Sequence, residues 1–167
     1  MIDRSRVYPV LAAGIAVAAD QMSKAWTLAH LPPLGGSLAL PGPVDLTLSM
    51  NESNAFGLAP VIGHATRWVL AGGNLVVAAI ILGALLTGRA RGLVGYGLAF
   101  IMAGATGNAL DRIFHGSVVD FLDASKIGFA WIFNLADATI DLGIALVVLA
   151  MLRERGGAVP GASASRR

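Results

Sequence analysis

The chain of 167 residues is 56% hydrophobic and 13% charged, it contains no cysteine, and its mean hydropathy is +0.72. Soluble globular domains carry about 25% charged residues, so these values exclude an ordinary soluble domain and indicate one membrane domain. The lack of cysteine excludes disulfides, thiol catalysis and thiolate metal sites.

The formal net charge of +2 could suggest a nucleic-acid partner, but the distribution of the charges argues against one. Basic residues gather at the N-terminus, in one short connection and in the C-terminal tail: Arg4, Arg6, Arg89, Arg91, Arg153, Arg155, Arg166 and Arg167. Most acidic residues lie toward the opposite ends of the apolar segments. By the positive-inside rule, we expect both termini in the cytoplasm and the acidic residues outside it, with no nucleic-acid partner.

Four apolar segments, at residues 7–28, 68–87, 93–110 and 132–152, approach the length of about 20 residues that crosses a bilayer. For the first segment a removable signal peptide is the alternative, because Arg4 and Arg6 precede it and residues 16–18 resemble a cleavage site. The apolar character resumes at Trp26, which favours a retained span. We therefore expect an all-α membrane protein with four transmembrane helices, as one catalytic domain over 1–153 and a flexible cytoplasmic tail over 154–167.

Residues 30–64 differ in character from the rest. Pro32-Pro33, Gly35-Gly36 and Pro41-Gly42-Pro43 mark turns, and residues 37–40 and 44–50 are typical of short strands. This segment predicts a small extracytoplasmic β-element between the first and second transmembrane helices.

Helical periodicity places polar residues together on the last two spans. Asn108, Asp111 and Arg112 share one face of the third span, and Asn134, Asp137 and Asp141 share one face of the fourth. In the third span, Gly95, Gly97, Gly104 and Gly107 would allow close helix approach. Two polar faces meeting near the outer surface predict a partly buried polar site.

Asp20 and Lys24 stand four residues apart near the outer end of the first span, where one helical face suits a carboxylate–ammonium pair. Two interpretations stay open. The pair is a simple interfacial salt bridge, or it supports the polar site.

Asp120 and Asp137 are the candidates for chemistry. The segment between them is long enough to fold back and bring the carboxyl groups together, and two such groups in contact would share a proton. One could then act as general base on water while the other protonates a carbonyl, and the pair would titrate as a unit. The structural alternative is that these acids only neutralise Arg112 and Lys126.

Other chemistries have weaker support. His30, His64 and His115 are scattered and give no metal-ligand spacing, so we expect no metal and no cofactor. His115 lies close to Ser117 in sequence, which leaves a serine dyad as a remote alternative. A small proton- or ion-coupled transporter could use the same carboxylates, although such acids are expected near the bilayer midplane.

The polar motifs of the chain resemble those of lipoprotein signal peptidases, or signal peptidase II. The resemblance rests on Asp20-Gln21-x-x-Lys24, Gly107-Asn108-x-x-Asp111-Arg112, Val118-Val119-Asp120-Phe121 and Phe133-Asn134-x-Ala136-Asp137, in the family's order. The resemblance implies a membrane aspartyl endopeptidase of the bacterial inner membrane. It would remove the signal peptide of a lipidated prolipoprotein, cutting before the diacylglyceryl-modified cysteine.

Carried over motif by motif, the resemblance makes Asp120 and Asp137 catalytic. Supporting or substrate-contacting roles fall on Asn51, Asn108, Asp111, Arg112, Asn134, Asp20 and Lys24. It also implies a small extracytoplasmic β-element, contact with membrane lipid and inhibition by globomycin-type cyclic peptides. We expect a monomer.

One motif departs from the family pattern. Where the family usually has Asn-x-Gly-Ala-Ala-Phe, this chain has Asn51, Glu52, Ser53, Asn54, Ala55 and Phe56. A serine in place of that glycine would be strained if the position requires positive φ. The departure therefore concerns substrate or inhibitor fit.

Overall fold

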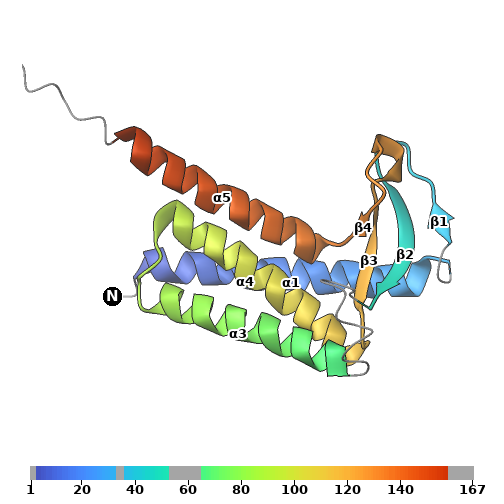
Figure 1. Ribbon diagram of the computed structural model, residues 1–167, viewed down its shortest axis with the longest axis horizontal. Helices are drawn as coiled ribbons and strands as arrows, with labels where there is room; N and C mark the ends of the chain where they lie inside the picture. The colour runs from blue at the N-terminus through green and yellow to red at the C-terminus, as the bar shows by residue number, and fades with distance from the viewer. Residues whose placement is uncertain (1–2, 33–35, 53–64, 158–167) are drawn as a thin grey trace, which may run out of the picture.

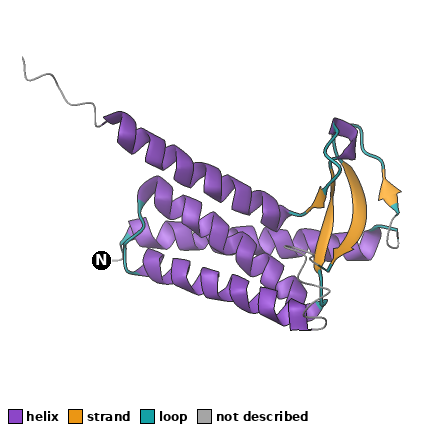
Figure 2. Ribbon diagram, in the orientation of Figure 1, coloured by secondary structure: helices purple, strands orange, loops and turns teal. Residues whose placement is uncertain are grey.

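The computed structural model describes residues 3–32, 36–52 and 65–157. Its helices are α1 (Arg4–His30), α3 (Thr66–Leu86), α4 (Gly92–Phe114) and α5 (Leu135–Gly157), with a short 3₁₀ turn at Ser125–Ile127. Its strands are β1 (Ser37–Leu38), β2 (Asp45–Asn51), β3 (Val118–Asp123) and β4 (Ile132–Phe133). The helices run side by side, and the strands lie across one end of them (Figures 1 and 2).

The predicted long helices are confirmed, and three of them have the length and composition of membrane spans. These are α3, α4 and the first 21 residues of α5. Exposed apolar side chains such as Ile80 and Leu152, 68% and 60% exposed, fit contact with lipid. Three of the four predicted spans thus match helices that are long and apolar enough to cross a membrane, and the membrane crossing of α1 stays a prediction.

Helix α4 lies between α3 and α5 and also packs on α1 (Figure 1). Small residues make this possible, as the spacing of the glycines predicts. A Cβ on Gly97 would lie 2.8 Å from the carbonyl oxygen of Gly143, and one on Gly104 would clash with the carbonyl oxygen of Ala136. The α4–α5 contact therefore brings backbone against backbone.

Two apolar clusters support this arrangement. The larger joins α1, α3 and α4 and includes Ala13, Ile81, Leu85 and Met102. The smaller lies between the sheet and the end of α1 and consists of Leu31, Leu48, Val119 and Phe121. The second cluster fixes β3 against the helical bundle.

The β-element is larger than the sequence suggests. Strands β1 and β2 confirm the two strands predicted near residues 37–40 and 44–50. The antiparallel order is β1-β2-β3-β4, so half of the sheet comes from the connection between α4 and α5. The sequence predicts no strand in this connection, so β3 and β4 are an addition to the predicted β-element. The first four residues of β3 are all buried, so the alternation that marks a half-exposed strand is absent.

The boundaries of the last helix also need correction. Ile132 and Phe133 pair with β3, so α5 begins at Leu135 and not at residue 132. It continues to Gly157, so residues 154–157 of the predicted flexible tail are helical. Residues 158–167 and the departing positions Ser53 and Asn54 lie outside the described residues.

Candidate active site

The polar residues singled out in the sequence meet where the helices join the sheet. The helices α1, α4 and α5 and the strands β2 and β3 each contribute to this site. Helix α1 contributes Asp20 and Lys24, α4 contributes Asn108, Asp111 and Arg112, and α5 contributes Asp137. Strands β2 and β3 contribute Asn51 and Asp120, and Asn134 directly precedes α5. Asp20, Lys24, Asp111, Asp120 and Asn134 are each at most 2% exposed. The prediction of a partly buried polar site at the meeting of the last two long helices is confirmed.

Lys24 is the centre of the deepest part. Its Nζ lies 2.9 Å from Asp20 Oδ2 and 2.8 Å from Asp111 Oδ2, and it donates to Asn108 Oδ1 at 3.2 Å. An ammonium has three hydrogens, and each has an acceptor here. The pair of Asp20 and Lys24 is therefore a buried connection between α1 and α4 and not a simple interfacial salt bridge.

The two carboxylates around Lys24 also hold backbone. Asp20 Oδ1 accepts from the N–H of Ala136 in the first turn of α5, at 2.8 Å. Asp111 Oδ2 accepts from the N–H of Val119 in β3, at 3.0 Å. A carboxylate near a helix N-terminus is favourable, and these bonds tie α5 and β3 to the other helices.

Gln21 also belongs to this cluster, although the sequence motif that contains it predicts no role for it. Its Nε2 lies within hydrogen-bond distance of Asp20 Oδ2 at 3.1 Å, Asp111 Oδ1 at 3.0 Å and the Gly107 carbonyl at 3.2 Å. Two carboxylates share one ammonium here, and this amide helps to compensate the excess negative charge. The available signal was its place beside Asp20 in an otherwise apolar helix.

Two asparagine side chains connect this cluster to the candidate pair. Asn134 Nδ2 lies 3.2 Å from Asn108 Oδ1 and 2.6 Å from Asp120 Oδ1. Asn108 Nδ2 donates to Asp137 Oδ1 at 2.7 Å. The chain Lys24–Asn108–Asp137 and its branch through Asn134 to Asp120 thus fix both candidate carboxyl groups from one side.

Asn134 caps α5. Its Oδ1 accepts from the N–H of Asp137 at 3.0 Å, while Asp137 Oδ2 lies 3.4 Å from the Asn134 N–H. This is the reciprocal arrangement of a capping box. Helical periodicity alone places Asn134 inside the helix, whereas Asn-x-x-Asp before an apolar run is itself a helix-start signal that would have located it.

Asp120 is fixed from the sheet. It lies in β3 and is 1% exposed. The Nδ2 of Asn51 in β2 donates to Asp120 Oδ2 at 2.9 Å, and the Nδ2 of Asn134 donates to Asp120 Oδ1. Burial raises the pKa of Asp120 to about 6. The bonds from Asn51 and Asn134 oppose that rise, Asp137 adds to it and Lys24 lowers it. Asp137 is joined to Asp120 through the side chains of Asn108 and Asn134, so the two carboxyl groups share one hydrogen-bond network.

The acids do not simply neutralise the two nearby cations. Lys126 pairs with Asp45 at 2.6 Å, away from the candidate pair. Arg112 forms no ion pair within the described part of the chain, and its Nη1 donates to the Asn108 carbonyl at 3.2 Å. The charges of Asp137 and Asp120 act on this half-buried guanidinium without a direct ion pair in that part of the chain.

The described residues give little structural support to the other sites considered from the sequence, which are Asp141, a serine dyad and a metal site. Asp141 is exposed and does not join the described hydrogen bonds, so its predicted place in the polar site is not supported. No hydrogen bond joins His115 to Ser117 in residues 65–157. Within the described ranges, no group of three His, Asp or Glu side chains is placed to hold a metal ion.

Comparison with known proteins gives one consistent result. Residues 12–153 match the family described as signal peptidase (SPase) II. The chain is 41% identical over 139 residues to the lipoprotein signal peptidase of Caulobacter vibrioides, covering 82% of each chain, and 39% identical over 147 residues to that of Gloeobacter violaceus, covering 86% of this chain and 80% of that one.

Two solved bacterial membrane enzymes share the fold. One has a TM-score of 0.74 at 24% identity and covers 95% of this chain and 94% of that one. The other has a TM-score of 0.73 at 26% identity, covering 86% and 92%. With the family match over most of its length and relatives above 30% identity, the chain belongs to the signal peptidase II family of bacterial membrane proteins.

Proposed function

We propose that this protein removes the signal peptide from diacylglyceryl-modified prolipoproteins, and that Asp120 and Asp137 are its catalytic pair. The observation that carries the proposal is the set of hydrogen bonds from Asn51, Asn108 and Asn134 that fixes both carboxyl groups. Membership of the signal peptidase II family supports the peptidase activity and the lipoprotein substrate.

The chemistry follows from two carboxyl groups that share one proton. The ionised carboxyl of the pair takes a proton from water, and the water oxygen attacks the carbonyl carbon of the scissile bond. The protonated carboxyl gives its proton to the carbonyl oxygen. When the tetrahedral species collapses, one of its hydroxyl groups gives a proton to the pair, the C–N bond breaks, and the other carboxyl of the pair gives its proton to the leaving nitrogen. The pair then holds one proton, as at the start. Burial raises the pKa of Asp120 to about 6, which moves the range in which the pair holds a proton toward neutral pH.

The neighbouring residues act by position. Asn51, Asn108 and Asn134 donate to the carboxyl oxygens and orient them. In this proposal Arg112 holds a substrate carbonyl. Asp20, Lys24 and Asp111 hold α1, α4, α5 and β3 together and so keep the pair in register.

Membrane embedding would position the substrate. In this proposal α1 is a fourth span, since its 27 residues extend about 40 Å at 1.5 Å per residue. Asp20 and Lys24 lower its hydropathy, yet both are buried against other helices. A prolipoprotein anchored by its lipid would already lie at the height of the pair, which converts a search in solution into a positioned encounter.

The orientation follows from charge. The start of α1, which carries Arg4 and Arg6, and the turn between α3 and α4, which carries Arg89 and Arg91, lie at the end of the bundle away from the sheet (Figure 1). The positive-inside rule assigns this end to the cytoplasm. Both termini are then cytoplasmic, and the pair and the sheet lie near the extracytoplasmic face. Two reporters can be fused into the turn at residues 88–92, one active only in the cytoplasm and one active only outside it. We expect activity from the first alone, and activity from the second alone would contradict the orientation.

The remaining expectations complete the proposal. The protein acts as a monomer of one domain, without metal or cofactor, in contact with membrane lipid. A globomycin-type peptide inhibits it by family resemblance. The transporter alternative is not favoured, because Asp120 lies in β3 and Asp137 in the first turn of α5, at one end of the helices and not midway along them.

The proposed function can be tested with purified protein in bilayers. Wild type receives one prolipoprotein with and without its diacylglyceryl group, and cleavage is followed by gel shift. We expect cleavage of the lipidated form, lost on addition of a globomycin-type inhibitor. No cleavage by folded wild type would contradict the proposal, and a proton-flux assay would then test transport.

A further inference from the structure

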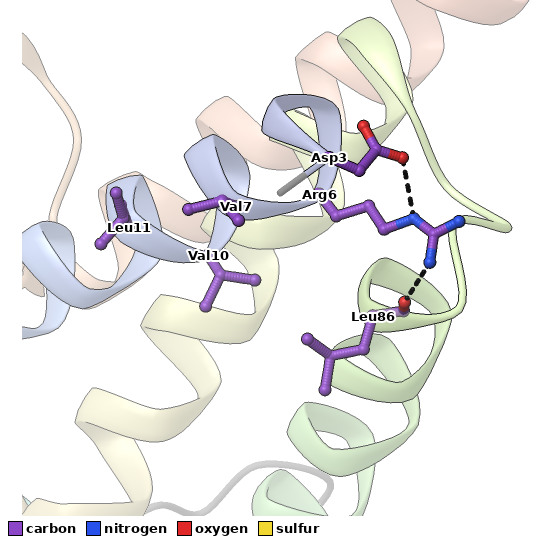
Figure 3. A pocket seen from close by; sticks show the side chains of 6 residues that line it. All are labelled: Asp3, Arg6, Val7, Val10, Leu11 and Leu86. Atoms are coloured by element: carbon purple, nitrogen blue, oxygen red, sulfur yellow. Dashed lines mark hydrogen bonds and ion pairs between the residues drawn. The ribbon is translucent and has the colours of Figure 1, made fainter. Parts of the chain in front are cut away.

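The end of the bundle farthest from the sheet contains a second polar site. There the first turn of α1 meets the turn between α3 and α4, and Arg6 Nη1 donates to the Leu86 carbonyl at 3.1 Å (Figure 3). Arg6 also pairs with Asp3 at 3.0 Å. None of these groups belongs to the proposed catalytic machinery.

Two guanidinium groups converge at this end. Gly88 has φ +72°, and a Cβ placed on it would lie 2.7 Å from Arg91 Nη2 and 2.9 Å from Arg6 Nε. Both arginines pair with the same carboxylate, Asp3, and Arg91 does so only at 3.8 Å. Asp3 also accepts from the backbone N–H and hydroxyl of Ser5. One shared carboxylate compensates two positive charges, so the site retains an excess of positive charge.

An open cavity lies beside these charges. Its volume is about 550 Å³, and six residues line it: Asp3, Arg6, Val7, Val10, Leu11 and Leu86. Figure 3 shows the charged side chains at one edge of it and the apolar side chains of α1 extending away from them. The lining therefore changes from cationic to apolar along α1.

We propose that this cavity binds an anionic phospholipid, with its phosphate at Arg6 and Arg91 and the start of an acyl chain along Val7, Val10 and Leu11. Basic pockets between membrane helices suit anionic headgroups. A free phosphate ion would match the charges but would leave the apolar lining in water, whereas a lipid matches both parts. The proposal needs only that the protein is embedded in a membrane, and it stands or falls independently of the proposed catalysis.

Native mass spectrometry of the purified protein can test it, with phosphatidylglycerol and phosphatidylcholine of the same chain length. Two basic residues near an anionic headgroup should favour phosphatidylglycerol by about tenfold or more. The double variant Arg6→Gln with Arg91→Gln should lose this preference. The matched control is Arg4→Gln with Arg89→Gln, which removes the same charge from exposed positions at the same end and should keep it.

Two further measurements distinguish a bound lipid from a bound phosphate ion and from general attraction to positive charge. Val10→Phe fills the cavity without altering charge and should abolish the preference, which keeps the test valid if the double arginine variant does not fold. Excess inorganic phosphate should not displace the lipid. The proposal would be overturned if wild type showed no preference for phosphatidylglycerol, or if both double variants lost that preference equally. It would also be overturned if Val10→Phe kept the preference, or if inorganic phosphate displaced the lipid.

Discussion

The two ends of the helical bundle hold their charges in opposite ways. At the sheet end, Lys24 and Asp20 are 2% and 1% exposed, and each of their polar atoms has a partner from another element or the next turn. At the far end, Arg6 and Asp3 are 38% and 42% exposed. A cation and a carboxylate thus pair once as a buried connector and once as a surface contact.

This difference shows where the fold needs charge. A buried ion must be paired and hydrogen-bonded, because leaving it without a partner costs several kcal/mol. Once paired it has one geometry, which is what two cooperating carboxyl groups require. An exposed pair contributes little energy and is screened by salt, so it is suited to contacting lipid headgroups and not to positioning catalysts.

Lys24→Met should have the largest effect on stability of the substitutions that compare the two ends. It leaves Asp20 and Asp111 buried without their cation, so we expect a loss of about 3–5 kcal/mol of stability together with loss of cleavage. Thermal unfolding in detergent measures the first effect. Arg6→Met at the other end is the control and should unfold close to wild type; similar losses in both variants would contradict the contrast.

Asn134 combines two roles that a pair of substitutions can separate. Asn134→Ala removes both the cap of α5 and the bond to Asp120, at a cost of about 1–3 kcal/mol. Asn134→Ser keeps a capping hydroxyl but cannot donate to Asp120 in the same way. We expect serine to restore most of the stability and little of the cleavage rate. Full recovery of both by serine would show that capping is the whole role.

The buried carboxyl of Asp120 gives a stability effect that depends on pH. Its pKa is about 6 in the fold against 3.8 for an ordinary aspartate. Folding therefore favours the protonated form, so the stability of wild type relative to Asp120→Asn is greatest below about pH 4 and falls as the pH rises through 6.

Asp123 on the same strand is the control of opposite sign. Hydrogen bonds from Ser125 and Thr47 lower the pKa of Asp123. The stability advantage of wild type over Asp123→Asn should therefore decrease as the pH falls below 3.8, the ordinary pKa of an aspartate. Thermal unfolding of the three proteins across this pH range checks both directions, and parallel curves would contradict the assignment.

The smallest expected effect is at the far end. Arg6→Gln removes an exposed ion pair, so stability in detergent should change by less than about 1 kcal/mol, and added salt should reduce the change further. Unfolding at low and high salt measures it. A larger, salt-independent loss would mean that this end is held as firmly as the sheet end.

The sequence could predict the long helices, the first half of the sheet and the residues of the site, because apolar runs, turn residues and polar motifs are local features. It could not predict that Lys24 joins Asp111 or that Asp20 holds the N–H of Ala136, since these contacts connect distant segments. The sequence does not predict strand β3, because burial on both faces removes the alternation of apolar and polar residues that marks a strand. Helical periodicity alone misplaces the start of α5, because it puts Asn134 on a helix face, whereas the pattern Asn-x-x-Asp marks a helix start.

The most direct test of the central claim exchanges single carboxyl groups for carboxamides in matched pairs. Asp120→Asn is compared with Asp123→Asn on the same strand, and Asp137→Asn with Asp141→Asn on the same helix, using single-turnover cleavage of a lipidated prolipoprotein. We expect both Asp120→Asn and Asp137→Asn, while inserted and folded, to lose cleavage, whereas the two controls stay within a few-fold of wild type. Substantial turnover by either Asp120→Asn or Asp137→Asn would contradict the catalytic pair.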